Sequence, residues 1–338
     1  MDPPYRNRRL RGNLDGGRLL RDKLLSMDFP PLFDELRLRR LSPPRTGPDA
    51  PVLRMVLDTD TYNEVDDQFA VVYALRSTER LRVEALYAAP FLNSRSKNPA
   101  DGMEKSYEEI LRLLSRMGLP AKGLVHKGST AFLPDWEHPH RSPAALDLVE
   151  RAMAGGDGAE ADPLYVVAIG AITNVASAIL IRPEIVRRIV VVWLGGNPVH
   201  YDHTREFNLM QDIPSSRLIF DCGVPVVHIP CMGVASHLLT TVAELERHLT
   251  GKNAVCDFLV ETVKGYHQDH FAWAKEIWDI STIGYLVDPE WVPTTLIHSP
   301  VVTDQLTWSV DRRRHLVRSA YFLARNPIFR DMFTKITK

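Results

Sequence analysis

Five carboxylic acids lie within ten residues of one another, in the segment DTDTYNEVDD at residues 58–67. The segment follows directly after an apolar run, VLRMVL at residues 52–57. Carboxylates packed this closely repel one another unless a cation neutralises them. All the donors are oxygen atoms and no cysteine or histidine lies nearby, so the pattern favours a hard cation, Ca²⁺ or Mg²⁺. The segment does not fit an EF-hand, because the glycine and the bidentate glutamate are missing from their required positions.

Two other interpretations of this segment stay open on the residues alone. In the first, the acids form a solvated turn, with Asp66 as the N-cap of the helix that follows. In the second, D-x-D after a strand resembles the motif of the haloacid-dehalogenase-type phosphatases, with Asp58 or Asp60 as the nucleophile. Tyr62 stands where that class has threonine, and the downstream lysine and acidic-pair motifs of the class are not evident.

The elements around the acidic segment alternate between short apolar, β-branched runs and stretches of helical periodicity. The predicted strands are residues 52–57, 81–89, 164–169, 189–194 and 225–230, and the predicted helices are residues 69–76, 103–117, 175–181 and 213–221. This alternation is typical of βαβ units. It predicts an α/β fold with a Rossmann-like, open, mixed but mostly parallel sheet and helices on both faces. Ligands bind at the carboxyl ends of such strands, where the acidic segment lies.

Composition excludes several classes of protein. The 338 residues are 45% hydrophobic and 25% charged, with a net charge of −1, which argues against a nucleic-acid partner. No run of about 18 apolar residues is present, so we expect no membrane span. The three cysteines form no C-x-x-C pair and their number is odd, which predicts reduced thiols and a cytoplasmic location.

Residues 1–50 differ from the rest of the chain. They hold 11 Lys and Arg against 7 Asp and Glu, and 7 of the 24 prolines, whereas the remainder holds 30 basic and 35 acidic residues. We therefore expect a basic, proline-rich N-terminal extension at residues 1–50, with its first ~25 residues poorly ordered, and one domain at residues 51–338. An alternative is that Met27 is the natural start and that residues 1–26 are not native.

Four motifs in sequence order resemble those of the nucleoside hydrolase family, whose best-known members prefer inosine and uridine. The acidic segment is similar to D-x-D-x-G-x-D-D, although five residues instead of three separate Asp60 from Asp66 and the glycine is absent. The other three are GAITN at residues 170–174, LGG at 194–196 with EFN at 206–208, and WD at 278–279 followed by DP at 288–289. The resemblance covers about residues 52–325. It implies hydrolysis of the N-glycosidic bond of a ribonucleoside to ribose and free base.

The resemblance also implies roles for individual residues. A Ca²⁺ ion would be held by the carboxylates of Asp60, Asp67 and Asp279 and by the backbone carbonyl of Ile169. Asp60 would in addition be the general base that takes a proton from the attacking water. The implied substrate-binding residues are Asp66 and Asn208 at ribose hydroxyls, Glu206 at the 5′-hydroxyl, and Asn93 in the loop after the second strand. A carboxylate at the 5′ end favours nucleosides over nucleotides.

The base pocket is where the chain departs from the inosine–uridine pattern. Trp278 stands where that branch has histidine and where a purine-preferring branch has tryptophan. The resemblance therefore implies that it stacks on the base, and the alternative is that it is a core residue. Residues 266–273 resemble in position a mobile helix that lines the base pocket. His267 and His270 would share a face of this helix, and we expect one of them to contact the base; the alternative is that both are surface residues.

The expected partner is a small nucleoside, and the resemblance implies a homodimer or homotetramer with a role in purine or pyrimidine salvage. The altered TYNEV loop leaves one further alternative open, a homologue that binds a ribosyl ligand without turnover.

Overall fold

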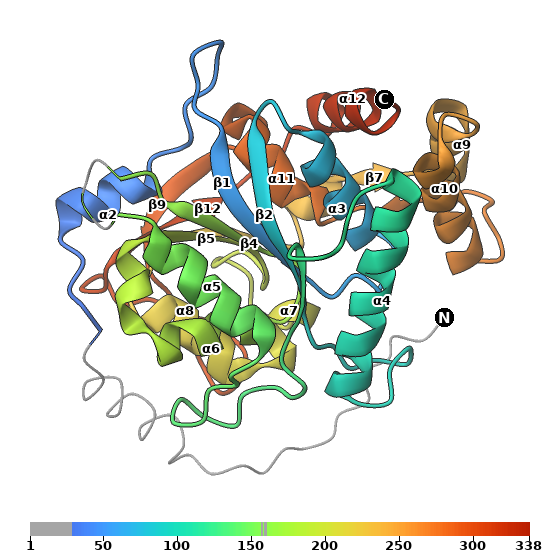
Figure 1. Cartoon of the computed structure of the whole chain (residues 1–338). Coiled ribbons are helices and arrows are strands. Elements are labelled where there is room, and N and C mark those ends of the chain that lie inside the picture. The colour runs from blue at the N-terminus through green and yellow to red at the C-terminus, as the bar shows by residue number, and fades with distance from the viewer. Residues whose placement is uncertain (1–28, 157, 159–160) are drawn as a thin grey trace.

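The computed structural model describes residues 29–156, 158 and 161–338. Its centre is an eight-stranded sheet in the order β3-β2-β1-β4-β5-β6-β12-β9 (Figure 1). The strands are β1 Leu53–Thr59, β2 Leu81–Ala88, β3 Val125–Lys127, β4 Leu164–Ala168, β5 Ile189–Leu194, β6 Val226–Ile229, β9 Thr294–His298 and β12 Leu316–Ala320. All neighbouring pairs in this sheet are parallel except β12 and β9. The prediction of a mixed, mostly parallel sheet is therefore confirmed.

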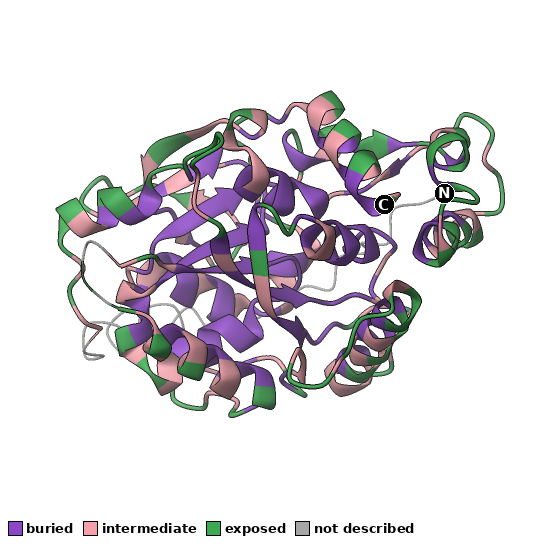
Figure 2. Ribbon diagram, turned by 45° about the horizontal axis from the view of Figure 1, so that its top comes forward, coloured by how far each residue is buried: buried purple, intermediate pink, exposed green. Residues whose placement is uncertain are grey.

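Helices cover both faces of the sheet, and each face has its own apolar core (Figure 2). One core is formed with α3 Asp67–Arg76, α4 Pro99–Met117, α9 Val242–Leu249, α10 Ala254–Tyr266, α11 Ile280–Val287 and α12 Arg325–Ile336. The other is formed with α5 Pro143–Ala154, α6 Thr173–Ile181 and α8 Ile213–Asp221. Burial from both sides explains why strands such as β5, IVVVWL, are continuously apolar. None of the helices in the described part of the chain combines the length and the apolarity that a membrane crossing needs.

The prediction of a helix at residues 266–273 is wrong. Helix α10 ends at Tyr266, and the chain then turns towards the short strand β8, Lys275–Glu276, which pairs with β7, Leu239–Thr240. The Asp269 carboxylate accepts a hydrogen bond from the Phe271 N–H at 2.9 Å. Such a side-chain bond to the backbone replaces helical bonds with a turn. His267 and His270 therefore do not share a helix face.

The described part of the N-terminal segment contains one helix, α2, Asp34–Leu41. Leu41 is fully buried, and its carbonyl oxygen accepts a hydrogen bond from Nε of Arg318 in β12. Arg37 donates to the carbonyl oxygen of Gly223 at 2.7 Å. Residues 34–41 are thus attached to the sheet, while the expected disorder of the first ~25 residues and the alternative start at Met27 lie outside the described residues. The domain boundary at residue 50 stays a prediction.

A buried histidine in β6 makes the fold sensitive to acid. His228 is fully buried, its Nε2 donates to the carbonyl oxygen of Gly195 at 2.8 Å, and burial lowers its pKa from 6.5 to about 4. The unfolded chain therefore binds a proton that the folded chain excludes, and stability is lost as the pH falls below 6.5. We expect this group to cost about 2 kcal/mol of the free energy of unfolding at pH 5 relative to pH 7.5.

Urea unfolding of the wild type and of His228→Gln at both pH values measures this cost. The difference in stability between the two proteins should shrink by about 2 kcal/mol at the lower pH, because glutamine does not titrate. An unchanged difference would show that His228 does not sense pH.

Candidate active site

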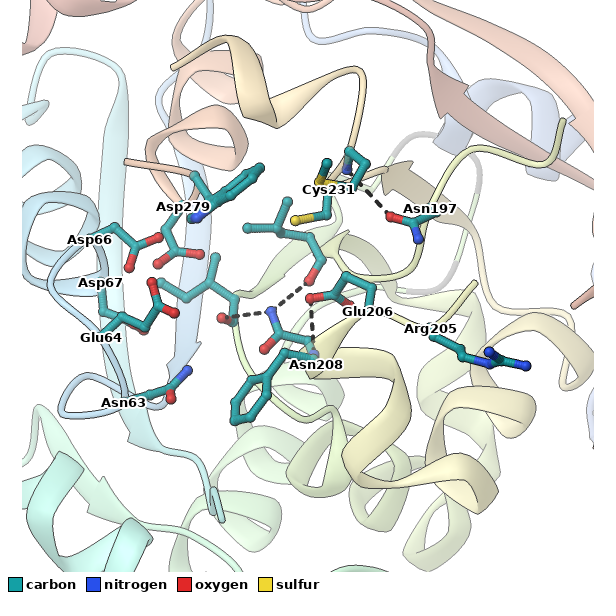
Figure 3. A pocket seen from close by; sticks show the side chains of 15 residues that line it. Asn63, Glu64, Asp66, Asp67, Asn197, Arg205, Glu206, Asn208, Cys231 and Asp279 are labelled. Atoms are coloured by element: carbon teal, nitrogen blue, oxygen red, sulfur yellow. Dashed lines mark hydrogen bonds between the residues drawn. The ribbon is translucent and has the colours of Figure 1, made fainter. Parts of the chain in front are cut away.

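A cavity of about 230 Å³ lies at the carboxyl ends of the central strands (Figure 3). Its lining comes from four places: the turn between β1 and α3, the ends of β4 and β5, the loops that follow β5 and β6, and the residues just before α11. The lining residues are Asn63, Glu64, Asp66, Asp67, Ile169, Leu194, Asn197, Arg205, Glu206, Phe207, Asn208, Cys231, Met232, Trp278 and Asp279. Seven of the predicted site residues thus share one cavity.

Three buried carboxylates form the centre of one wall. Asp66, Asp67 and Asp279 each bring an oxygen atom within 4.8 Å of the others, and Figure 3 shows these side chains pointing toward one another. Parallel pairing of β1 with β4 places the start of this turn next to Ile169, whose N–H donates to the Asp58 carbonyl oxygen at 2.9 Å. The end of β1, the end of β4 and the start of α11 lie side by side here, which brings together residues that are far apart in sequence.

Asp60 lies next to this trio but does not belong to it. It is fully buried, and neither of its carboxylate oxygens has a hydrogen-bond partner among the described residues. A Cβ added at Gly170 would come within 2.9 Å of its Cγ, so the carboxyl group packs directly against the backbone of the GAITN turn. A buried carboxylate without partners is costly, which indicates a ligand at this position.

The carboxylates strongly perturb one another. Burial, followed by the charges of neighbouring carboxylates, raises the pKa of Asp60, Asp67 and Asp279 well above 3.8. Burial raises the pKa of Asp66 to about 6, and the Lys275 ammonium opposes this rise. Without a cation the cluster therefore holds protons that a divalent ion would displace.

The interpretation of this segment as a solvated helix cap is wrong. Asp66 occupies the N-cap position of α3, but its side chain makes no capping hydrogen bond there. Asp58, Asp60, Asp66 and Asp67 are all buried. Thr59 Oγ1 donates to Asp67 Oδ1 at 2.5 Å and so holds this carboxylate towards the end of the strand.

The opposite wall is organised by the EFN motif. Glu206 caps α7, Phe207–Gln211, and its carboxylate accepts hydrogen bonds from the N–H groups of Gly196, Asn208 and Leu209 at 2.7–3.0 Å. Burial raises the pKa of Glu206, and these backbone donors oppose the rise. Asn208 Nδ2 donates to the carbonyl oxygens of Ile169 and Leu194 at 3.1 and 3.0 Å, so the amide oxygen is left for the cavity.

Four predicted site residues do not line the cavity: Asp60, Asn93, His267 and His270. Asp60 is buried beside the cavity, as described above. The rings of His267 and His270 pack on Trp273, with centroids 5.3 and 5.6 Å away, because α10 ends before them. Asn93 lies behind Asn63 and donates from Nδ2 to Asn63 Oδ1 at 2.6 Å.

Sequence reasoning also missed several lining residues. Asn63 and Glu64 belong to the TYNEV stretch, which was treated as a departure from a motif and not as a source of side chains. Asn197 follows LGG directly, and Cys231 and Met232 follow the predicted strand at residues 225–230. The rule that ligands bind beyond strand ends could have identified all three.

Comparisons with known proteins agree with this geometry. The family model for inosine-uridine preferring nucleoside hydrolase matches residues 55–325. The pyrimidine-specific ribonucleoside hydrolase RihA of Klebsiella pneumoniae is 27% identical over 267 residues, which cover 70% of this chain and 80% of that protein. RihA of Salmonella typhimurium is 28% identical over 264 residues, with the same shares covered.

Two solved structures share the fold. The plant nucleoside hydrolase PpNRh1 has a TM-score of 0.67 at 19% identity, covering 85% of this chain and 99% of that one. The purine-preferring ribonucleoside hydrolase from Gardnerella vaginalis has a TM-score of 0.65 at 20% identity, covering 84% and 98%. The family match favours a glycosidic hydrolase over the phosphatase alternative. The chain belongs to the inosine-uridine preferring nucleoside hydrolase family and is an N-glycosyl hydrolase.

Proposed function

We propose that this protein hydrolyses the N-glycosidic bond of a ribonucleoside, giving ribose and free base, and that it needs Ca²⁺ to do so. The observation that carries the proposal is the convergence of buried carboxylates with Glu206, Asn208 and Trp278 around one cavity. Acids on one wall and the EFN motif on the other leave room between them for a sugar.

The donors present suit a hard divalent cation. Both oxygens of Asp60 are buried without a partner among the described residues, and Asp67 and Asp279 lie close together. We infer that these three carboxylates and the Ile169 carbonyl would hold the ion, because an all-oxygen set matches Ca²⁺. When bound, such an ion acidifies water and fixes its position relative to the sugar.

The residues of the chain would then divide the remaining work. Asp60 takes the proton of the attacking water, for which its unpartnered carboxylate is suited. Asp66 and the free amide oxygen of Asn208 bind ribose hydroxyls from opposite sides of the cavity. The Glu206 carboxylate at the far end repels a 5′-phosphate, so nucleosides are preferred over nucleotides.

Replacing Trp278 should affect a purine nucleoside more than a pyrimidine nucleoside. If its indole ring stacks on the base, Trp278→Ala should lower kcat/KM for inosine by about tenfold or more, since one stacked base contributes roughly 1–3 kcal/mol. Uridine, with its smaller ring, should lose less, and Trp278→Phe should keep most of the activity. Base release from both nucleosides measures this; a larger loss for uridine would contradict stacking on a purine.

A panel of ribonucleosides, assayed for free ribose in the presence of Ca²⁺, tests the proposed function. Phosphate release from p-nitrophenyl phosphate with Mg²⁺, and none of ribose, would instead support a phosphatase. Ribose binding without turnover of any nucleoside would support a binding protein.

We also propose that the protein acts in nucleoside salvage in the cytoplasm as a homodimer or homotetramer. Sedimentation of the full chain tests the assembly, and a monomer at assay concentrations would contradict it.

A further inference from the structure

We propose that Asn63 donates a hydrogen bond to a ring hydroxyl of the substrate sugar, and that Asn93 is the positioning residue that sets the direction of its amide. This inference rests on the proposed function and deepens it, because it identifies a residue that selects ribose over deoxyribose. Asn63 belongs to the TYNEV stretch, which is two residues longer than the motif it resembles.

The hydrogen bonds determine which way both amides point. The Arg95 backbone N–H, which can only donate, lies 2.8 Å from Oδ1 of Asn93, so that atom must be the amide oxygen. The other end of the Asn93 amide is therefore NH₂, and it donates to Asn63 at 2.6 Å. An NH₂ group accepts nothing, so the Asn63 atom that faces it must be oxygen. The NH₂ group of Asn63 is consequently turned away from Asn93.

The NH₂ group of Asn63 faces the cavity. Asn63 lines it beside Glu64 and Asp66, and Figure 3 shows the labelled amide at the acidic wall. The residue as a whole is only 8% exposed, and no described residue accepts a hydrogen bond from its Nδ2. The Nδ2 atom is not itself sealed from solvent, so it opens onto the cavity. A ligand atom that accepts hydrogen bonds can take the place of water there.

The charges of the neighbouring side chains exclude an anionic ligand atom at this position. The carboxylates of Asp66, Asp67 and Asp279 on the same wall would repel an anionic acceptor. A hydroxyl group satisfies both demands, because it donates to a carboxylate and accepts from the amide. One hydroxyl of the vicinal pair on a ribose ring therefore matches Asn63, and a deoxy sugar would leave the amide unpaired.

The loop that carries Asn63 is fixed from both sides. Its backbone N–H donates to the Asp60 carbonyl oxygen at 2.6 Å. Arg95 donates to the Glu64 carbonyl oxygen at 3.2 Å and stacks over the Tyr62 ring at 4.5 Å. On the other side, Lys275 Nζ forms an ion pair with Glu64 at 2.7 Å. The Asn63 amide is thus held in place before a substrate binds, as a selective contact requires.

Two variants and one control test the inference by the ratio of kcat/KM for a ribonucleoside to that for its 2′-deoxy and 3′-deoxy analogues. Asn63→Ala should lower one of these ratios by about tenfold, the value of one hydrogen bond, and leave kcat/KM for that deoxy analogue nearly unchanged. Asn93→Asp should do the same without touching the substrate, because a carboxylate at residue 93 accepts and so reverses the Asn63 amide.

Ser96→Ala is the matched control. Ser96 Oγ accepts from the Asn93 backbone N–H at 3.3 Å, so the change affects the same loop but neither amide, and both ratios should stay within about twofold of wild type. Calorimetry should show the wild-type Ca²⁺ affinity in Asn63→Ala and Ser96→Ala, neither of which changes a charge, and this separates the effect from the cation site. Wild-type ratios in Asn63→Ala, for both deoxy analogues, would overturn the inference while leaving the hydrolase proposal intact.

Binding measurements keep the inference testable if no nucleoside is cleaved, the outcome that refutes the proposed function. Calorimetric titration with D-ribose, 2-deoxy-D-ribose and 3-deoxy-D-ribose should then show a preference for ribose that Asn63→Ala reduces about tenfold. Equal binding of the three sugars, or no binding at all, would overturn it.

Discussion

Replacing Asp60 with asparagine is expected to lower kcat for ribose release by about 10²–10⁴-fold, the usual contribution of a general base. Asparagine has nearly the same shape, so it fits against the Gly170 backbone as aspartate does. It cannot take a proton from water, and it removes one negative charge from the set that would hold the cation. Stopped assays of ribose release with saturating Ca²⁺ measure the loss.

Asp58→Asn is the matched control for this substitution. Asp58 is also buried, two residues earlier in β1, but its Oδ1 already accepts a hydrogen bond from Asn174 Nδ2 at 2.8 Å. Burial raises its pKa to about 7, so a neutral side chain is close to its state in the folded protein. We expect at most about a tenfold loss of kcat in this variant. Equal losses in both variants would contradict a special role for Asp60.

Removal of the cation is expected to abolish ribose release and to lower the melting temperature, and Ca²⁺ should restore both. Asp60, Asp66, Asp67 and Asp279 repel one another in the folded chain and separate on unfolding. A ligand present at about 1,000 times its Kd stabilises a protein by about 4 kcal/mol. Calorimetric scans with chelator and with added Ca²⁺ measure this shift.

The rise in melting temperature that Ca²⁺ causes should depend on pH, and it should be larger at high pH. Burial raises the pKa of Asp66 to about 6, above the 3.8 of an exposed aspartate, so the cation-free folded chain binds protons that the unfolded chain releases. These protons stabilise the folded chain below pH 3.8, and the stabilisation is lost as the pH rises through about 6. Ca²⁺ should therefore raise the melting temperature more at pH 8 than at pH 5.5. A shift of the same size at both pH values, or none, would contradict the cation site.

The sequence predicted most of the sheet because its signals there are local. The apolar run at residues 189–194 and the helical spacing at 213–221 match β5 and α8 in full. Helix α4 was predicted to end at Met117, which it does because Gly118 takes a left-handed conformation, with φ of 67°. Its start at Pro99 was missed, since the cap that Asn98 provides lies five residues before Met103, where the predicted helix began.

The missed features depend on contacts between distant segments. Strands β9 and β12 escaped prediction because β9 is a half-exposed edge strand and β12 joins the sheet through the distant strand β6, where Arg318 pairs with Val227. The turn at Asp269 interrupts a stretch whose aromatic spacing is typical of a helix. Asn93 was predicted to bind substrate, but Asn63 lines the cavity in its place. This depends on how the two loops that carry these residues meet, which sequence periodicity does not indicate.

The most direct test of the account is a single reaction in isotopically labelled water. Wild-type protein with Ca²⁺ and a ribonucleoside should release ribose and base in equal amounts, with the heavy oxygen in the ribose and none in the base. The release should stop with chelator and in Asp60→Asn. Absence of ribose, or release that continues unchanged after chelation and in Asp60→Asn, would contradict cation-dependent hydrolysis at this site.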